Sequence, residues 1–464
     1  MKLKKNEDKQ GEISMAKVTD MTKGSTTKHI LKFTLPLLLG NLFQQCYNLV
    51  DSIVVGRHVG KNALAAVGAC GSLNFLFFSL SAGLCIGVGV IVAQYFGAGE
   101  EEQIKKYIGN AVYMLAGAVL VISFIGICFA PQILRLLSTP EKIIGDSICY
   151  LQITCAGIVA VTAYNGVASV LRALGDSRTP LFFLILASII NIVFDLVFVL
   201  AFDMGVMGVA LATVISQVIS AVTSFVYALK KVSYFQLSRV HLKFESAIVR
   251  HILRISVPIS LQSSLISVSC IILQRVVNGF GETVMATYTI TMRIEQLVQQ
   301  PYSSLGTALT TYSGQNMGAG DIGRVRKGMR SATVMALIFS VAMLPVAYIF
   351  GKPIAHMFAK EPEVVMMGAK ALRITSLCYF PLGMIYVPRA LLNGVGDAQF
   401  AMINGISEVL CRIVFSTVLT KIPVIGYWGI WITSGATWTV TAIVCLIRYF
   451  RGTWKQKGIT KKAI

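Results

Sequence analysis

The segment Gln94-Tyr95-Phe96-Gly97-Ala98-Gly99 returns later in the chain as Gln315-Asn316-Met317-Gly318-Ala319-Gly320, at a shift of 221 residues. The dipeptide Gly175-Asp176 returns at the same shift as Gly396-Asp397. Repetition at a fixed distance is the sequence signature of an architecture built from copies of one unit. The two halves of the chain are therefore duplicates.

The amino-acid composition indicates a membrane protein. The 464 residues are 55% hydrophobic and 13% charged, and their mean hydropathy is +0.71. Soluble globular proteins carry about 25% charged residues, whereas this chain divides into apolar stretches of roughly the 20 residues that cross a bilayer. We predict an all-α integral membrane protein with twelve transmembrane helices. The predicted spans are 30–55, 64–96, 107–129, 143–171, 180–201, 208–230, 252–278, 284–316, 331–357, 363–391, 399–421 and 428–449.

Six spans in each half form two six-helix lobes related by a pseudo-twofold axis along the membrane normal, since an even number of spans makes the repeats parallel. We expect an N-terminal tail over 1–29, an N-lobe over 30–230, a linker over 231–251, a C-lobe over 252–449 and a C-terminal tail over 450–464. Secondary transporters are often built from such repeats, with the substrate site between them. The duplication therefore favours a transporter.

The basic residues predict the orientation of the chain. Of the 41 Lys and Arg residues, 28 fall on one side of the twelve-span arrangement and 7 on the other. Because cytoplasmic loops are enriched in Lys and Arg, we expect both termini in the cytoplasm and a multi-pass protein of the plasma (inner) membrane. The net charge of +20 is then a topology signal. Membrane lipids are the expected neighbours of these side chains, and no nucleic acid is expected.

Four carboxylates lie within the predicted spans, and an ionisable group there costs about 2.5–3.5 kcal/mol on insertion scales. They are Asp51, Asp195, Glu295 and Glu408. Such residues are candidate functional groups. Asn191 precedes Asp195 by four residues and shares its helix face, and the spans place Asp51, Asp195 and Thr213 at one depth. Oxygen atoms at one level favour a hard-cation site or a carboxylate that carries a proton. In the alternative interpretation, the carboxylates simply reach water near helix ends.

The second half lacks this acidic set, because the shift of 221 replaces Asp195 by Ser416 and Asn191 by Arg412. Any ion-coupling chemistry therefore belongs to the N-lobe. The C-lobe carries its own charges, namely Arg293, Glu295, Arg389, Glu408 and Arg412. Glu408 and Arg412 are four residues apart and are expected to pair. The set is interpreted as structural pairing or a gate, or else as a cavity wall that contacts the substrate.

These residues carry a family resemblance. The spacing from Pro36 to Asp51, the Gln94-x-x-Gly-Ala-Gly turn, Arg172-Ala-Leu-Gly-Asp176, Asn191-x-x-x-Asp195 and Thr213 together resemble the multidrug and toxic compound extrusion (MATE) family. The likeness extends from about Lys28 to Phe450.

The resemblance implies two lobes around a central cavity that opens alternately to each side, with H+ or Na+ exchanged for an organic, often cationic compound. It maps the coupling ion onto Asp51 and Asp195, which would be metal ligands only if Na+ is used. It maps associated polar positions onto Asn191, Thr213 and Asn165, and the family's bending proline onto Pro36. Some relatives place a coupling carboxylate in the span 252–278, where this chain has Gln262 and Gln274.

We therefore expect a secondary antiporter that exports small organic, cationic and amphipathic compounds, acts as a monomer and needs no cofactor besides the coupling ion. A flippase or exporter of a lipid-linked or other endogenous metabolite on the same fold is the alternative. An enzyme is not expected, since the chain has no HExxH, GxSxG or Walker lysine motif. A channel is disfavoured because no filter sequence or charged ring is present.

Overall fold

The computed structural model describes residues 18–137 and 139–460, and this part of the chain is helical without a β-strand. An N-terminal bundle, residues 26–231, contains α1 (Thr26–Val54), α2 (Lys61–Ala98), α3 (Glu101–Cys128), α4 (Ala130–Leu136), α5 (Glu141–Ala173), α6 (Arg178–Leu196) and α7 (Gly205–Lys231). A C-terminal bundle, residues 246–451, contains α8 (Ser246–Val277), α9 (Glu282–Gly318), α10 (Ile322–His356), α11 (Pro362–Ser376), α12 (Tyr379–Gly394), α13 (Ala398–Leu419) and α14 (Gly429–Arg451).

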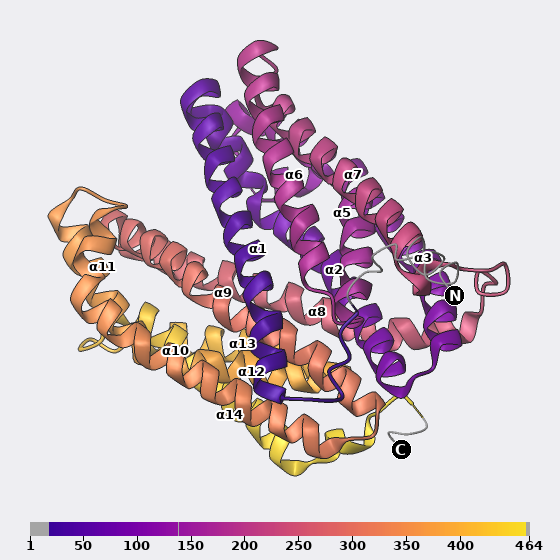
Figure 1. Cartoon of the computed structure of the whole chain (residues 1–464). Helices are drawn as coiled ribbons and strands as arrows, with labels where there is room; N and C mark the ends of the chain where they lie inside the picture. Colours follow the sequence, from indigo (N-terminus) through magenta and orange to yellow (C-terminus); the bar gives the residue numbers. More distant parts are fainter. Residues whose placement is uncertain (1–17, 138, 461–464) are drawn as a thin grey trace, which may run out of the picture.

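The two bundles meet along α1 and α2 of the first and α8 and α9 of the second. They converge at the end of the molecule where α1 begins and α14 ends, which we call the terminal end, and they diverge toward the opposite, distal end (Figure 1). Apolar packing crosses between the bundles. One core cluster joins Ile30 and Phe33 of α1 to residues of α9, α10, α12 and α14, and a second joins α2, α3 and α5 to α8.

Each predicted span falls on helical structure. The span 363–391 is divided between α11 and α12, with Leu377 and Cys378 between them. Pro381 lies in the first turn of α12 and has no N–H to donate to the carbonyl of Leu377, which accounts for the break. Helix α8 begins at Ser246, so residues 246–251 of the predicted linker are helical.

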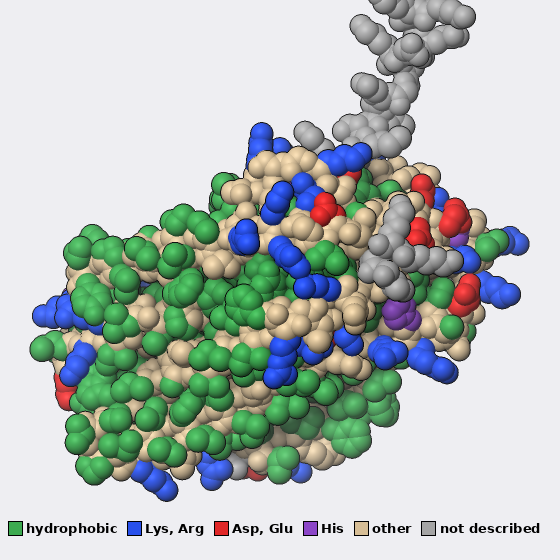
Figure 2. Space-filling view, turned by 90° about the horizontal axis from the view of Figure 1, so that it is seen from below, with side chains coloured by type: hydrophobic (Ala, Val, Ile, Leu, Met, Phe, Trp, Pro, Cys, Tyr) green, Lys and Arg blue, Asp and Glu red, His purple; other side chains and the backbone are tan. Residues whose placement is uncertain are grey.

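The surface is that of a membrane protein. Nine helices among the described residues are long and apolar enough to cross a bilayer. The remaining spans are α1 and α9, which are more polar, and the pair α11 and α12. Figure 2 shows hydrophobic side chains over much of one face, mainly its left and lower parts, with Lys and Arg across its middle and upper right and a few at its left and lower margins. Large apolar side chains such as Leu120, Phe124, Ile338 and Ile349 are more than half exposed. An apolar surface of this extent is stable in lipid and not in water.

The connection between the bundles packs closely on α3. Phe235 is buried, and the Tyr113 hydroxyl donates to the carbonyl oxygen of Leu242 at 2.8 Å. Asn110 accepts from the backbone N–H of Glu245 at 2.8 Å and donates to the carbonyl oxygen of Lys243 at 3.2 Å. The connection is therefore held against the N-terminal bundle at the terminal end.

Candidate functional site

The acidic site of the N-terminal bundle is built on α6 and α7. Asp195 is fully buried, and Asn191 lies one turn earlier on the same face and is also buried. The side-chain amide of Asn191 donates to the Thr213 hydroxyl on α7 at 3.4 Å. The spacing of four residues thus brings the carboxylate and the amide to one side of α6, facing α7.

Asp51 joins this group from the last turn of α1. Its carboxylate and that of Asp195 are close enough to interact as charges. Four oxygen atoms of the site are buried and have no hydrogen-bond partner in the described part of the chain: Asp51 Oδ1, both carboxylate oxygens of Asp195, and Asn191 Oδ1. Buried polar atoms are nearly always paired, and each unpaired one costs about 1–3 kcal/mol. The structure therefore brings Asp51, Asp195, Asn191 and Thr213 together around these oxygens.

Two further features surround the carboxylates. Tyr150 of α5 and Tyr47 of α1 both interact electrostatically with the two carboxylates, and the Tyr150 side chain is buried. In addition, α1 and α6 each continue into a π-helical turn, Val55–Val59 and Val197–Ala201, which begins within about one helical turn of the acidic residue. Turns of this kind occur frequently at functional sites. Sequence reasoning did not identify Tyr150 or the π-helical turns, because no local pattern marks them.

Two candidate residues lie apart from the carboxylates. Asn165 is a partly buried residue of α5, and within the described residues neither a hydrogen bond nor a charge interaction joins it to Asp51 or Asp195. Pro36 lies inside α1, which is helical from Thr26 to Val54. Any influence of Pro36 on Asp51 therefore passes along the helix, since Pro36 precedes the aspartate by about four turns at 3.6 residues per turn.

The charges of the C-terminal bundle form a network of buried and partly buried side chains, with one exception. The Arg412 guanidinium donates to the Glu408 carboxylate at 3.1 Å, as the spacing predicts, and both side chains are buried. Glu295 interacts electrostatically with Arg412, and its Oε1 atom has no hydrogen-bond partner among the described residues. The guanidinium of Arg389 lies 4.8 Å from the ring centre of Tyr386. Arg293 is exposed and stands outside this network.

The duplicated Gln-x-x-Gly-Ala-Gly motif closes the terminal end. Gln94 on α2 donates to the carbonyl oxygen of Gly394 at the end of α12, at 2.9 Å. Gln315 on α9 donates to the carbonyl oxygen of Ala173 at the end of α5, at 2.8 Å. Both donors and both acceptors are related by the shift of 221 residues (315 − 94 and 394 − 173). Each bond caps the last turn of a helix in the other bundle, so the two bonds form a symmetric seal between the bundles.

The chain segments outside the bundles strengthen this seal. Before α1, the backbone N–H of Met21 donates to Gln315 Oε1 at 2.9 Å, and after α14 that of Ile459 donates to Gln94 Oε1 at 2.8 Å. The glycines of the motif allow the approach, because a Cβ atom at Gly97 would overlap the Gln315 carbonyl and one at Gly318 would overlap that of Gln94. Only glycine fits at these two crossing points of α2 and α9.

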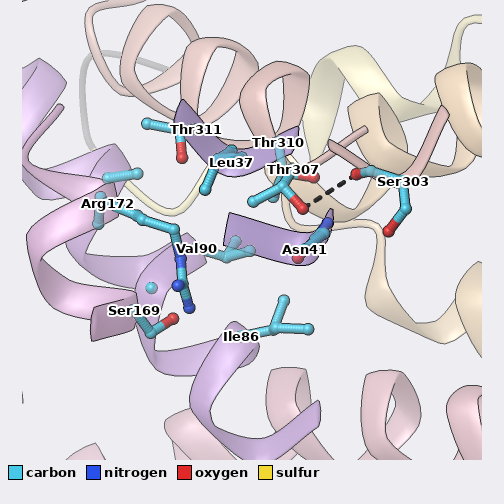
Figure 3. Close-up of a pocket in the computed structure, with 13 residues that line it drawn as sticks. Leu37, Asn41, Ile86, Val90, Ser169, Arg172, Ser303, Thr307, Thr310 and Thr311 are labelled. Carbon is cyan, nitrogen blue, oxygen red and sulfur yellow. Dashed lines mark hydrogen bonds between the residues drawn. The ribbon is translucent and has the colours of Figure 1, made fainter. Parts of the chain in front are cut away.

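A pocket of about 190 Å³ lies between the bundles, next to the seal (Figure 3). Its walls come from α1, α2 and α5 of the N-terminal bundle and from α9 of the C-terminal bundle. The lining is Leu37, Asn41, Ile86, Gly89, Val90, Ala93, Ser169, Arg172, Ala173, Ser303, Thr307, Thr310 and Thr311. Arg172 is the single charged residue among them, and Figure 3 shows its side chain extending into the pocket beside Ser169.

Comparison with known proteins gives consistent matches. The family model MatE matches residues 36–197 and again 258–418. The chain is 30% identical to the probable multidrug resistance protein YpnP of Bacillus subtilis, over 96% of this chain and 100% of that protein. It is 23% identical to the probable multidrug resistance protein NorM of Thermotoga maritima, over 93% and 94% of the two chains. A solved structure of the outward-facing conformation of a multidrug resistance MATE family transporter superposes with a TM-score of 0.88 at 24% identity, over 95% of this chain and 99% of that one.

The fold with its two duplicated bundles and the site between them define a polytopic membrane transporter. The family model covers most of the chain in two matches. The chain belongs to the multidrug and toxic compound extrusion (MATE) family.

Proposed function

We propose that this protein is a secondary antiporter that exports small organic compounds in exchange for H+ or Na+ by alternating access. The coupling ion binds at Asp51 and Asp195, with Asn191 and Thr213 completing the site. The observation that carries this proposal is the group of four buried oxygens in the N-terminal bundle that have no hydrogen-bond partner among the described residues. A proton on one carboxylate, or a sodium ion among the carboxylate and amide oxygens, would satisfy them.

The pairing of the intramembrane carboxylates supports a coupling role for Asp51 and Asp195 over a structural one. Structural carboxylates inside membrane proteins pair with basic groups, as Glu408 does with Arg412. No ion pair to Asp51 or Asp195 exists among the described residues. The pair of carboxylates thus has the chemistry of a site that is filled and emptied during transport.

The terminal end faces the cytoplasm in this proposal, because it carries most of the Lys and Arg residues. The Gln94 and Gln315 seal then closes the cytoplasmic side while the bundles diverge toward the outside (Figure 1). Transport requires the seal to break, so that the pocket beside it opens to the cytoplasm. Since the two bonds are related by the duplication, they are expected to break together as the bundles rock about their contact.

The test uses purified protein in liposomes loaded with a cationic dye, with a pH gradient or a sodium gradient imposed. We expect native protein to export the dye against its concentration gradient under one of the two conditions. The variants Asp51→Asn and Asp195→Asn keep the shape of the side chain and remove its charge, and both should lose uphill export. The matched control is Asp146→Asn, which changes an exposed aspartate of α5. Undiminished gradient-driven export by both site variants would refute the proposed coupling role.

A second cargo class has support from one relative. The chain is 22% identical to a protein of Shewanella oneidensis described as an FAD transporter, over 83% of this chain and 85% of that protein. An endogenous metabolite, as opposed to a drug-like cation, is therefore the alternative substrate. Export of a flavin nucleotide by the reconstituted protein, without export of cationic dyes, would favour this alternative.

A further inference from the structure

The pocket beside the seal contains a guanidinium, that of Arg172, with no hydrogen-bond or ion-pair partner among the described residues. Arg172 lies in the last turn of α5. The charge interactions of Arg172 are with Tyr164 and Cys85, which are both neutral side chains at pH 7. No Asp or Glu lines the pocket. The guanidinium is thus a partly buried charge, and a charge withdrawn from water is costly unless an opposite charge compensates it.

Arg172 is not needed to cap its own helix. A basic side chain near a helix C-terminus often bonds the last carbonyl groups, but here those carbonyls have other donors. The bonded carbonyls are those of Val170, Leu171, Arg172, Ala173 and Leu174, whose donors are Leu174, Asp176, Gly175, Gln315 and Thr19. The side chain of Arg172 instead extends away from them into the pocket (Figure 3).

The rest of the lining offers neutral donors around the guanidinium. Hydroxyl groups come from both bundles, and those of Ser169, Ser303 and Thr311 have no hydrogen bond of their own in the described residues. Gly89 faces Ser169 so closely that a Cβ atom there would lie 2.6 Å from the serine oxygen. The close approach of α2 leaves the hydroxyl beside the guanidinium. One fixed positive charge with several hydroxyl donors matches a group with a single negative charge.

We propose that Arg172 binds a carboxylate group of the transported compound, so that the protein exports zwitterionic or anionic organic molecules as well as cations. The guanidinium fork fits the two oxygens of a carboxylate. A phosphate monoester carries about −1.5 to −2 charges, which a single arginine does not neutralise. The pocket lies against the seal, since Ala173 both lines the pocket and accepts the Gln315 bond. This site would therefore be the first to meet a substrate when the seal opens. The inference rests on the proposed export function and adds the chemical group that is recognised.

The test compares two dyes that differ in one group. Rhodamine 110 has a free carboxylate, and rhodamine 123 is its methyl ester. Binding to purified protein is measured by fluorescence polarisation at equilibrium, with no ion gradient, for native protein and for Arg172→Gln and Arg172→Lys. The matched control is Arg178→Gln, which removes an exposed positive charge six residues later. Because the measurement needs no gradient, it is independent of whether the coupling proposal succeeds.

We expect native protein to bind rhodamine 110 more tightly than the ester. Arg172→Gln should weaken binding of rhodamine 110 by about tenfold or more, the value of a lost charged hydrogen bond, and leave rhodamine 123 unchanged. Arg172→Lys should retain part of the preference, since it keeps the charge and loses the fork. The proposal is overturned if the native protein binds the acid no more tightly than the ester. It is also overturned if Arg172→Gln affects both dyes equally, which would indicate a structural role, or affects neither.

Discussion

Replacing one glycine at the crossing of α2 and α9 should hold the terminal end open. In Gly97→Ala the new Cβ atom would lie 2.6 Å from the carbonyl carbon of Gln315 and 2.8 Å from its Cα atom. In Gly318→Ala the corresponding distances to Gln94 are 2.6 Å and 2.7 Å. These are backbone atoms of a helix and cannot rotate away. Since ordinary contacts begin at 3.4 Å, the helices must separate by at least about 0.8 Å (3.4 − 2.6).

The cost of this overlap applies to the sealed conformation alone. Overpacking of a close contact costs about 1–3 kcal/mol, and a change of this size shifts a two-state equilibrium by about 5- to 150-fold. The separation also stretches the hydrogen bonds of Gln94 and Gln315, which adds to the shift. Each glycine variant should therefore populate the conformation in which the pocket opens to the terminal side.

Access to the pocket measures this shift. Ser169, which lines the pocket beside the seal, is replaced by cysteine, and its modification by a membrane-impermeant maleimide is followed by mass spectrometry from each side of oriented vesicles. We expect Gly97→Ala and Gly318→Ala to accelerate modification from the terminal side. The control is Gly117→Ala on α3, where a Cβ atom meets nothing within 4 Å. Equal rates in native protein, control and both variants would refute the role assigned to the seal.

Three further sets of variants test the seal, the buried ion pair and the acidic site separately. Gln315→Leu removes two hydrogen bonds of the seal and should also increase modification of the cysteine at position 169. Gln94→Leu should increase it by the same factor, because the two bonds are related by the duplication. A difference between the two variants would contradict a symmetric seal. Arg412→Met leaves Glu408 buried without its partner and should lower the free energy of unfolding by about 3–5 kcal/mol. The double variant Arg412→Met, Glu408→Leu should regain this stability. A single variant as stable as native protein in thermal unfolding would show that the pair is not structural. Asn191→Ala removes a buried, unpaired oxygen of the acidic site and should raise the H+ or Na+ concentration needed for half-maximal export. Asn278→Ala, which changes an exposed residue of the distal end, should leave that concentration unchanged.

The sequence was sufficient for the architecture because hydropathy and duplication act at the scale of whole helices. Runs of apolar residues predicted the twelve spans, and the spacing of four residues predicted both the pairing of Glu408 with Arg412 and the shared face of Asn191 and Asp195. The arrival of Asp51 beside Asp195 followed from their similar depth. These features depend on distances along one helix or on depth in the bilayer, and both can be counted from the sequence.

Features that depend on packing between distant segments could not be counted in this way. Tyr150 interacts electrostatically with the carboxylates from a third helix. The duplicated glutamines were recognised as a repeat, without any indication that each would cap a helix of the other bundle. Residues before α1 and after α14 were predicted as tails, yet Met21 and Ile459 bond to these glutamines. The break in span 363–391 was also not predicted, although Pro381 supplies its cause. In each case the deciding partner lies far away in the chain.

The most direct test of ion coupling uses a dye gradient to drive ion movement, instead of an ion gradient to drive dye export. Liposomes containing the protein are given a dye gradient and no ion gradient, and the movement of H+ and Na+ is followed with a pH-sensitive dye and with radioactive sodium. An antiporter that couples through Asp51 and Asp195 must move one of these ions opposite to the dye, and Asp195→Asn must abolish that movement. Dye flux through native protein without any counter-movement of H+ or Na+ would contradict the account.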